Sequence, residues 1–177
     1  SMASGEYFMV TENAVESDGS LRGIGEGVWS YTATGAVAAG TVLTLADFTL
    51  QSGSSGLSGS GDQIIAYYTT DAANSQTTSS PSTYLCALDT KSGGWITSGS
   101  TSTTNSYLPT GLTDGTTAVS FGTHSDNGAY DGSTMSGSAS DLRAAINNFA
   151  NWNTHSTTLP AFITTGFSVT GSGGAAG

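Results

Sequence analysis

The sequence predicts a mainly β fold, a single β-sandwich with one short α-helix near residues 140–150. Short apolar runs with alternating side chains recur along the chain, and clusters of Gly, Ser, Thr, Asn and Asp separate them. Eight such runs occur within 177 residues, a spacing typical of sandwiches and barrels. One further segment has helical periodicity instead, which predicts the single helix.

The first four runs lie in the N-terminal part of the chain and span Glu6–Glu12, Gly27–Ala33, Gly40–Leu50 and Asp62–Thr70. In the second run, Trp29 and Tyr31 share one face, and we expect this aromatic face to turn toward the core. In the third run, Leu43 and Leu45 share a face in the same way.

The remaining four runs span Thr83–Leu88, Gly93–Gly99, Thr116–Gly122 and Ala161–Thr170. Cys86 lies in the first of them and is the only cysteine, so the chain can form no internal disulfide. Because Cys86 alternates with apolar neighbours, we expect it to be a small buried core residue.

The helical segment has apolar residues at positions i, i+3, i+4 and i+7, namely Leu142, Ala145, Ile146 and Phe149. Ser138 or Ser140 is placed to cap a helix over residues 140–150, and Asp141 in the first turn favours its dipole. We expect the helix to pack on the sandwich, with Trp152 completing the contact.

The domain organisation is expected to be simple, with one β-sandwich domain over residues 6–170. Residues 1–5 resemble a protease-cleavage scar with a disordered start, and residues 171–177 form a flexible Gly/Ala tail. The polar segment Thr69–Ser82 is interpreted as a hairpin loop or insertion, because predicted strands flank it on both sides.

Charge excludes several classes of partner. Thirteen acidic and three basic residues give a net charge of -10, which repels nucleic acid and disfavours anionic membrane surfaces. No apolar run of about 18 residues is present, so we expect no membrane insertion. The polar surface comes from 28 Ser and 28 Thr rather than from ions, which suits an extracellular or cell-surface setting.

Asp62, in the stretch SGSGDQIIAYY, admits two interpretations. An acid between Gly61 and a β-branched run is typical of a turn that opens a strand. A catalytic or metal-binding carboxylate is the alternative, but it needs other acids nearby that the sequence does not place.

A weak calcium site is predicted in the segment Thr123–Ser133. Asp126, Asn127 and Asp131 offer oxygen ligands of the kind that Ca²⁺ prefers. Their spacing does not match an EF-hand loop, and DNG and DG are also turn dipeptides, so a plain loop is the competing interpretation. No other cofactor is expected.

Aromatic residues suggest a weak ligand site. Trp95 follows SGG in a predicted turn, and we expect it to be the most exposed of the three tryptophans. Trp95 and Tyr107 are therefore the candidates for a sugar-stacking surface, with core packing as the competing role.

No motif supports catalysis. His124 and His155 lack the spacing of zinc ligands, no G-x-S-x-G elbow is present, and no pair of carboxylates is singled out. We therefore expect the protein not to be an enzyme.

Several segments together resemble an uncharacterised β-sandwich module of secreted bacterial and cyanobacterial surface proteins. The matching segments are SLRGIGEGVWSYTA, VAAGTVLTL, SGDQIIAYY, YLCAL, GGW, LPTGLTDGTTAVSF, DNGAYDG and LRAAINNFANW. The strand order is also similar to that of lamin-tail, immunoglobulin-like sandwiches. The resemblance implies an extracellular, non-catalytic accessory domain in which Asp62 belongs to the turn before a core strand. It carries no catalytic residues to transfer.

We therefore expect a structural module of an extracellular or surface layer that acts in adhesion, in a matrix or in a self-assembling sheet. Its partners would be itself or other surface and matrix proteins, and an organellar protein layer is a second setting. The alternative function is a ligand-binding accessory domain that recognises a glycan or Ca²⁺.

Overall fold

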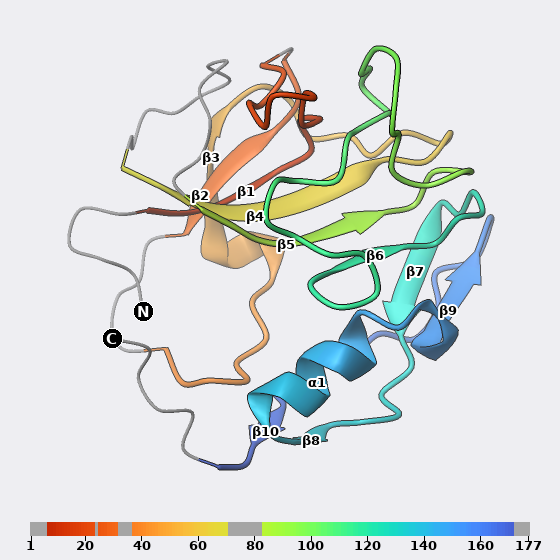
Figure 1. Cartoon of the computed structure of the whole chain (residues 1–177). Helices are drawn as coiled ribbons and strands as arrows, with labels where there is room; N and C mark the ends of the chain where they lie inside the picture. The colour runs from red at the N-terminus through yellow and green to blue at the C-terminus, as the bar shows by residue number, and fades with distance from the viewer. Residues whose placement is uncertain (1–6, 24, 32–36, 71–82, 172–177) are drawn as a thin grey trace.

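The computed structural model describes residues 7–23, 25–31, 37–70 and 83–171. These residues form a mainly β fold with a six-stranded mixed sheet and one short α-helix, which confirms the predicted class (Figure 1). The arrangement is consistent with a β-sandwich, while the immunoglobulin-like order of strands stays a prediction. The predicted scar at residues 1–5, most of the Thr69–Ser82 loop and nearly all of the tail lie outside the described residues.

The large sheet has the strand order β3-β2-β1-β4-β5-β6. Its strands are β1 (Tyr7–Thr11), β2 (Val28–Tyr31), β3 (Phe48–Ser52), β4 (Gln63–Thr69), β5 (Thr83–Asp89) and β6 (Ala118–Ser120). All neighbours are antiparallel except β5 and β6, which run parallel. Strand β3 is therefore one edge of this sheet, and the short β6 is the other.

The C-terminal part of the chain forms the remaining elements. Strand β7 (Asn127–Tyr130) pairs antiparallel with β9 (Trp152–His155), and β8 (Ser136–Gly137) pairs parallel with β10 (Ser168–Val169). The helical elements are α1 (Ala139–Ile146) and two 3-10 turns, η1 (Leu45–Asp47) and η2 (Phe149–Asn151). Figure 1 shows α1 and the β7–β9 pair on one side of the large sheet.

Three of the eight predicted strands are wrong in whole or in part. Thr44 and Asp47 close a tight turn, with the Thr44 N–H donating to Asp47 Oδ2 at 2.6 Å, so the strand begins only at Phe48. Gly93–Gly99 forms no strand, because Gly93 and Gly94 adopt φ values of 90° and 68°. Only Ser168–Val169 of the last run is a strand.

Strand β7 lies where the sequence predicts a loop. Strand β9 begins at Trp152, which the sequence predicts only as a contact of the helix. Aromatic packing holds them against the end of β6. The Trp152 ring lies 5.3 Å from that of Phe121 and 6.3 Å from that of Tyr130, measured between centroids. These contacts join residues far apart in the chain, so no local signal announces the pair.

The helix confirms the predicted cap and contact. Ser138 is the N-cap, and its hydroxyl accepts from the Asp141 N–H while Asp141 bonds back to Ser138. The helix ends earlier than predicted, at Ile146, and η2 follows. The Trp152 indole N–H donates to the Ile146 carbonyl at 2.7 Å, so Trp152 does close the helix end.

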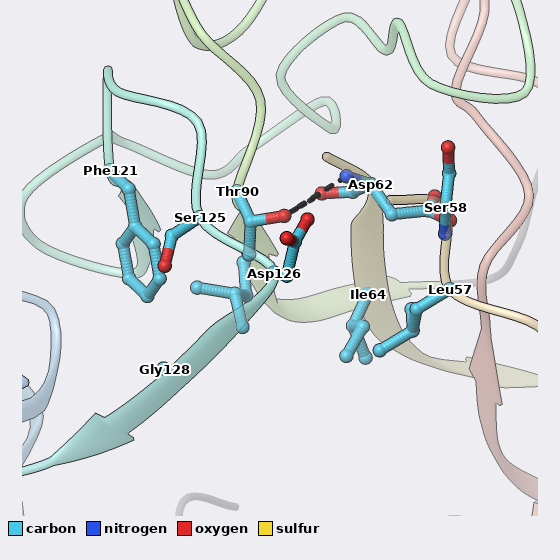
Figure 2. A pocket seen from close by; sticks show the side chains of 10 residues that line it. Leu57, Ser58, Asp62, Ile64, Thr90, Phe121, Ser125, Asp126 and Gly128 are labelled. Atoms are coloured by element: carbon cyan, nitrogen blue, oxygen red, sulfur yellow. Dashed lines mark hydrogen bonds between the residues drawn. The ribbon is translucent and has the colours of Figure 1, made fainter. Parts of the chain in front are cut away.

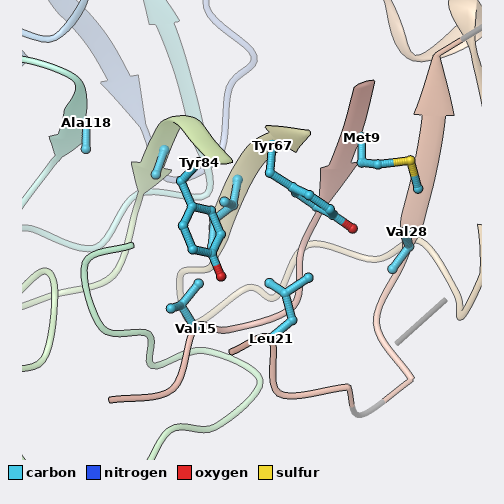
Figure 3. Close-up of a cluster of buried hydrophobic side chains, with 9 residues drawn as sticks. Met9, Val15, Leu21, Val28, Tyr67, Tyr84 and Ala118 are labelled. Carbon is cyan, nitrogen blue, oxygen red and sulfur yellow. The ribbon is translucent and has the colours of Figure 1, made fainter. Parts of the chain in front are cut away.

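The main hydrophobic core covers one face of the large sheet (Figure 3). Met9, Ile65 and Tyr67 point into it from the central strands β1 and β4, and all three are fully buried. On this side, irregular chain between β1 and β2 packs against the strands through Val15 and Leu21. This irregular layer is anchored by the Tyr84 hydroxyl, which donates to the Gly19 carbonyl at 2.8 Å.

The second face of the sheet is aromatic and, apart from the buried Trp29, half-buried. Phe8 contacts Tyr31, Phe48 and Tyr68, with ring centroids 5.8–6.3 Å apart. Trp29 and Tyr31 therefore lie on this face, and Val28 is the β2 residue that enters the main core. The expected inward turn of this aromatic face is confirmed for Trp29, which is only 6% exposed, although the face lies opposite the main core and Tyr31 is half-buried.

Cys86 is not the buried core residue that its pattern predicts. Its side chain is exposed to a hollow of about 430 Å³ between β5 and α1, which Leu142 and Arg143 also line. The surrounding protein nevertheless removes much of the water around the sulfur, which raises the pKa of the Cys86 thiol, and the nearby Arg143 opposes this shift. Among the described residues, no helix has the length and apolar character needed to cross a bilayer.

Candidate functional site

Asp62 is held as a turn residue by bonds to its own surroundings (Figure 2). Its carboxylate accepts from the Ser58 N–H at 2.9 Å and from the Gln63 N–H at 2.8 Å. Its own N–H donates to the Thr90 hydroxyl at 3.0 Å. Gly61 has a φ of 88°, and a Cβ there would lie 2.6 Å from Lys91 Cα, so the turn requires glycine. These bonds agree with the turn interpretation of Asp62.

A small hollow of about 100 Å³ brings Asp62 and Asp126 to one place (Figure 2). The Asp126 carboxylate lies 2.8 Å from His124 Nε2, on the side of the loop that leads into β7. The rest of the lining is largely apolar and includes Ile64 and Phe121. The sequence treats these two acids as separate candidates, and the fold makes them neighbours of the same hollow.

The structure does not bring the three predicted calcium ligands together. Asp126 precedes β7 and Asp131 follows it, so roughly 17 Å of extended chain separates them. The Asn127 side-chain amide donates to the His155 carbonyl at 3.4 Å, and the Asp131 carboxylate accepts from the Ser133 N–H at 2.8 Å. Within the described ranges, no group of three or more His, Cys, Asp and Glu side chains could hold a metal ion. Calcium binding stays a prediction.

Trp95 and Tyr107 are brought close by their backbones. The Ile96 N–H donates to the Ser106 carbonyl at 3.0 Å, which places the two segments side by side. Trp95 is half-buried against the main core, and its indole N–H reaches Asp114 at 3.3 Å. Trp95 therefore packs against the core and remains partly exposed to solvent. Glycan recognition stays a prediction.

A group of buried acids surrounds the glycine-rich loop 53–61, and the sequence does not single it out. Burial, then the neighbouring Asp62 and Glu12, raise the pKa of Glu26 to about 8, and Arg22 opposes the shift. Burial also raises the pKa of Glu12, whose carboxylate accepts from the Gly56 N–H. Strand register creates this group, because β1 pairs with both β2 and β4.

Asp89 is a further buried acid, at the end of β5. Burial raises its pKa to about 6, even though its carboxylate accepts from the Lys91 N–H at 2.6 Å. Four acids with raised pKa values thus lie near one end of the large sheet, in a protein that has only three basic residues.

The aromatic face of the sheet carries a groove of about 530 Å³. Its floor and walls come from β1, β2, β3, β4, the segment around η1 and the glycine-rich loop 53–61. The lining residues are Phe8, Val10, Glu12, Trp29, Thr41, Leu43, Thr44, Leu45, Phe48, Leu57 and Ile64. We call this feature the aromatic groove. The sequence predicts the strands that form the groove. It does not predict that residues 41–45 fold back over these strands and line the groove.

The edge strand β3 is exposed and uncharged. Its sequence is FTLQS, and within the described part of the chain it pairs with β2 alone. Leu50 is 46% exposed, and Leu45 beside it is 58% exposed. The Gln51 side chain donates to the Ser30 hydroxyl of β2 at 2.7 Å and to the Thr49 carbonyl at 3.2 Å.

Comparison of the chain with protein-family models, with curated proteins and with solved structures found no match. The resemblance to a secreted surface module therefore stays a prediction.

Proposed function

We propose that this chain is a non-catalytic structural module of an extracellular or surface layer. In this proposal it assembles with copies of itself or with other surface and matrix proteins. The observation that supports the proposal is the exposed edge strand β3, which carries no charged residue.

An open edge strand presents unpaired N–H and C=O groups to any strand that can lie beside it. Soluble proteins usually protect such edges with Lys, Pro or a bulge in the edge strand itself. Strand β3 contains neither Lys nor Pro. Its one irregularity is at Gln51, an extra residue between Leu50 and Ser52, which pair with Trp29 and Val28, and the stretch Phe48–Leu50 is regular. A strand added at β3 would also lie beside the exposed Leu50.

The net charge of -10 opposes contact between copies, and salt weakens this repulsion. The Debye length falls to about 10 Å at 0.1 M salt and about 3 Å at 1 M, so exposed charges on neighbouring molecules are then largely screened. We therefore expect assembly to increase with both protein concentration and salt.

The test is light scattering across protein concentration and salt, with Leu50→Lys and Leu159→Lys as a matched pair. Both leucines are exposed, and Leu159 lies outside the described strands. Wild type and Leu159→Lys should grow in mass as salt rises, and Leu50→Lys should not. A wild-type chain that stays monomeric throughout would contradict the proposal, as would a Leu50→Lys variant that grows as the wild type does.

The second candidate function is a ligand-binding accessory domain that recognises a glycan or Ca²⁺. The close approach of the Trp95 and Tyr107 segments favours it. A ligand binder should show a saturable rise in melting temperature with glycan or calcium, with no change in mass. Such a result in the scattering samples would favour this candidate over assembly.

A further inference from the structure

The aromatic groove has the size and the lining of a small-molecule site. Its volume of about 530 Å³ lies within the range of roughly 300–1,000 Å³ that such sites occupy. Phe8, Trp29 and Phe48 supply aromatic surface, and Leu45 and Leu57 form a rim that is more than half exposed. An occupant would bury this apolar surface, which now faces water.

Glu12 is the one ionisable side chain among the described residues that line the groove. It is only 6% exposed, and the hydrogen bonds to its carboxylate from the Gly56 N–H are long, at 3.3 and 3.4 Å. Asp62 and Glu26 lie close enough to interact electrostatically with it. No Lys, Arg or His stands in the described lining, so the Glu12 carboxyl group has no basic counter-ion in the groove wall.

We propose that the aromatic groove binds a small amphipathic cation, with an ammonium group at Glu12 and an apolar body along Phe8, Trp29 and Phe48. A cation there would gain a charge-assisted hydrogen bond to Glu12 in a partly desolvated setting. The aromatic rings would cover the apolar body and offer their negative faces to the cation.

Other classes of ligand fit the groove less well. A glycan needs several polar partners, but beside Glu12 the polar side-chain groups of the described lining are the Trp29 indole N–H and the hydroxyls of Thr41 and Thr44. The Thr41 hydroxyl donates to the Ala38 carbonyl, and the Thr44 hydroxyl to the Asp47 carboxylate. A fatty-acid anion has the right apolar body, but its carboxylate would find no Lys, Arg or His in the described lining and would lie against the Glu12 carboxyl group.

The inference goes beyond the proposed assembly, because it concerns a small ligand on the sheet face, whereas an added strand would lie beside β3. The two surfaces share Phe48, which belongs to β3 and lines the groove. Binding can therefore be measured in dilute, low-salt samples whose mass is that of the monomer. The two proposals then fail separately, one by the absence of binding and the other by the absence of growth.

The experiment is calorimetric titration with decylammonium and with decanoate, each below its micelle concentration. Ethylammonium serves as a cation that lacks the apolar body. We expect decylammonium to bind at one site per chain and at least about tenfold more tightly than decanoate, since the difference reflects one charged hydrogen bond. Ethylammonium should not bind measurably. Equal affinity for decanoate, or several equivalent decylammonium sites, would overturn the proposal.

Variants locate the site. Glu12→Gln keeps the shape of the side chain and should remove the preference for decylammonium over decanoate. Leu45→Ser, on the exposed rim, should weaken both ligands, and Leu159→Ser, outside the groove, should weaken neither. If Glu12→Gln does not fold, the comparison of Leu45→Ser with Leu159→Ser still tests the proposal. Equal affinity of these two variants for decylammonium would show that the ligand does not bind in the aromatic groove.

Discussion

Asp62 illustrates how a single carboxylate can organise a loop rather than a reaction. Its two oxygens accept from the Ser58 and Gln63 N–H groups, and its own backbone is bonded to Thr90. Burial raises the pKa of Asp62, because few charged partners offset the loss of water. The geometry thus supports a positioning role for this acid at the start of β4.

Removing the Asp62 carboxylate should therefore destabilise the fold. We expect Asp62→Ala to lower the free energy of unfolding by about 1–3 kcal/mol, because two backbone donors lose their acceptors. Asp126→Ala, which removes a more exposed acid from the same hollow, should change it by less than about 0.5 kcal/mol. Urea unfolding measures both values, and equal effects of the two variants would show that Asp62 has no special structural role.

The buried acids predict an unusual dependence of stability on pH. The pKa of Glu26 rises from 4.5 to about 8 on folding, and that of Asp89 from 3.8 to about 6. The folded state therefore binds protons more tightly than the unfolded state over this range, and stability must fall as pH rises from about 4.5 to about 8. Asp18 and Asp47 have lowered pKa values, but they titrate below this window.

Urea unfolding between pH 5 and pH 8.5 tests this dependence. The free energy of unfolding should decline steadily with pH, and Glu26→Gln should flatten the decline in its upper part. A free energy that rises over the same window would contradict the assignment of Glu26 and Asp89 as acids protonated by folding.

The irregular layer over the main core is as important to stability as the strands that it covers. Leu21 is fully buried there, against strand residues such as Tyr67 (Figure 3). Leu21→Ala should cost about 2–5 kcal/mol through lost burial and the cavity that remains. Leu159→Ala, at a residue 66% exposed, should cost little. A small loss for Leu21→Ala in urea unfolding would show that this layer contributes little to stability.

Elements with strong local signals were predictable from the sequence. Strand β4 and helix α1 each combine a clear periodicity with a start signal, Asp62 for the strand and Ser138 for the helix. Gly93–Gly99 has a strand-like composition, but its glycines take positive φ and turn the chain. Strand β7 exists because of its partner β9, and composition alone cannot report that pairing.

The candidate sites were less predictable than the fold, because they depend on register. The neighbours of Glu12 come from positions 26, 56 and 62, and the pairing of β1 with β2 and β4 brings them together. The aromatic groove depends in addition on the return of residues 41–45 over the sheet. The sequence did identify Asp62 and Asp126 as acids of interest, but not that they share a hollow.

The whole molecule combines a net charge of -10 with few ions of either sign, since only 9% of its residues are charged. Most of its polar groups are hydroxyls, which can meet those of a neighbour without the large desolvation cost of ions. In the proposed assembly, the edge strand β3, which pairs with β2 alone among the described residues, and the exposed Leu50 would provide a directional contact on this weakly charged surface. These properties together favour association that is weak in dilute solution and stronger at high salt.

The most direct measurement is amide hydrogen exchange of the β3 segment, Phe48–Ser52, in two states of the wild-type chain. One state is dilute at low salt, and the other is concentrated at high salt. If copies add strands at this edge, the β3 amides should become protected in the second state while those of the short edge β6 keep their rate. Assembly that leaves β3 exchange unchanged would contradict the account, because the copies would then meet through another surface.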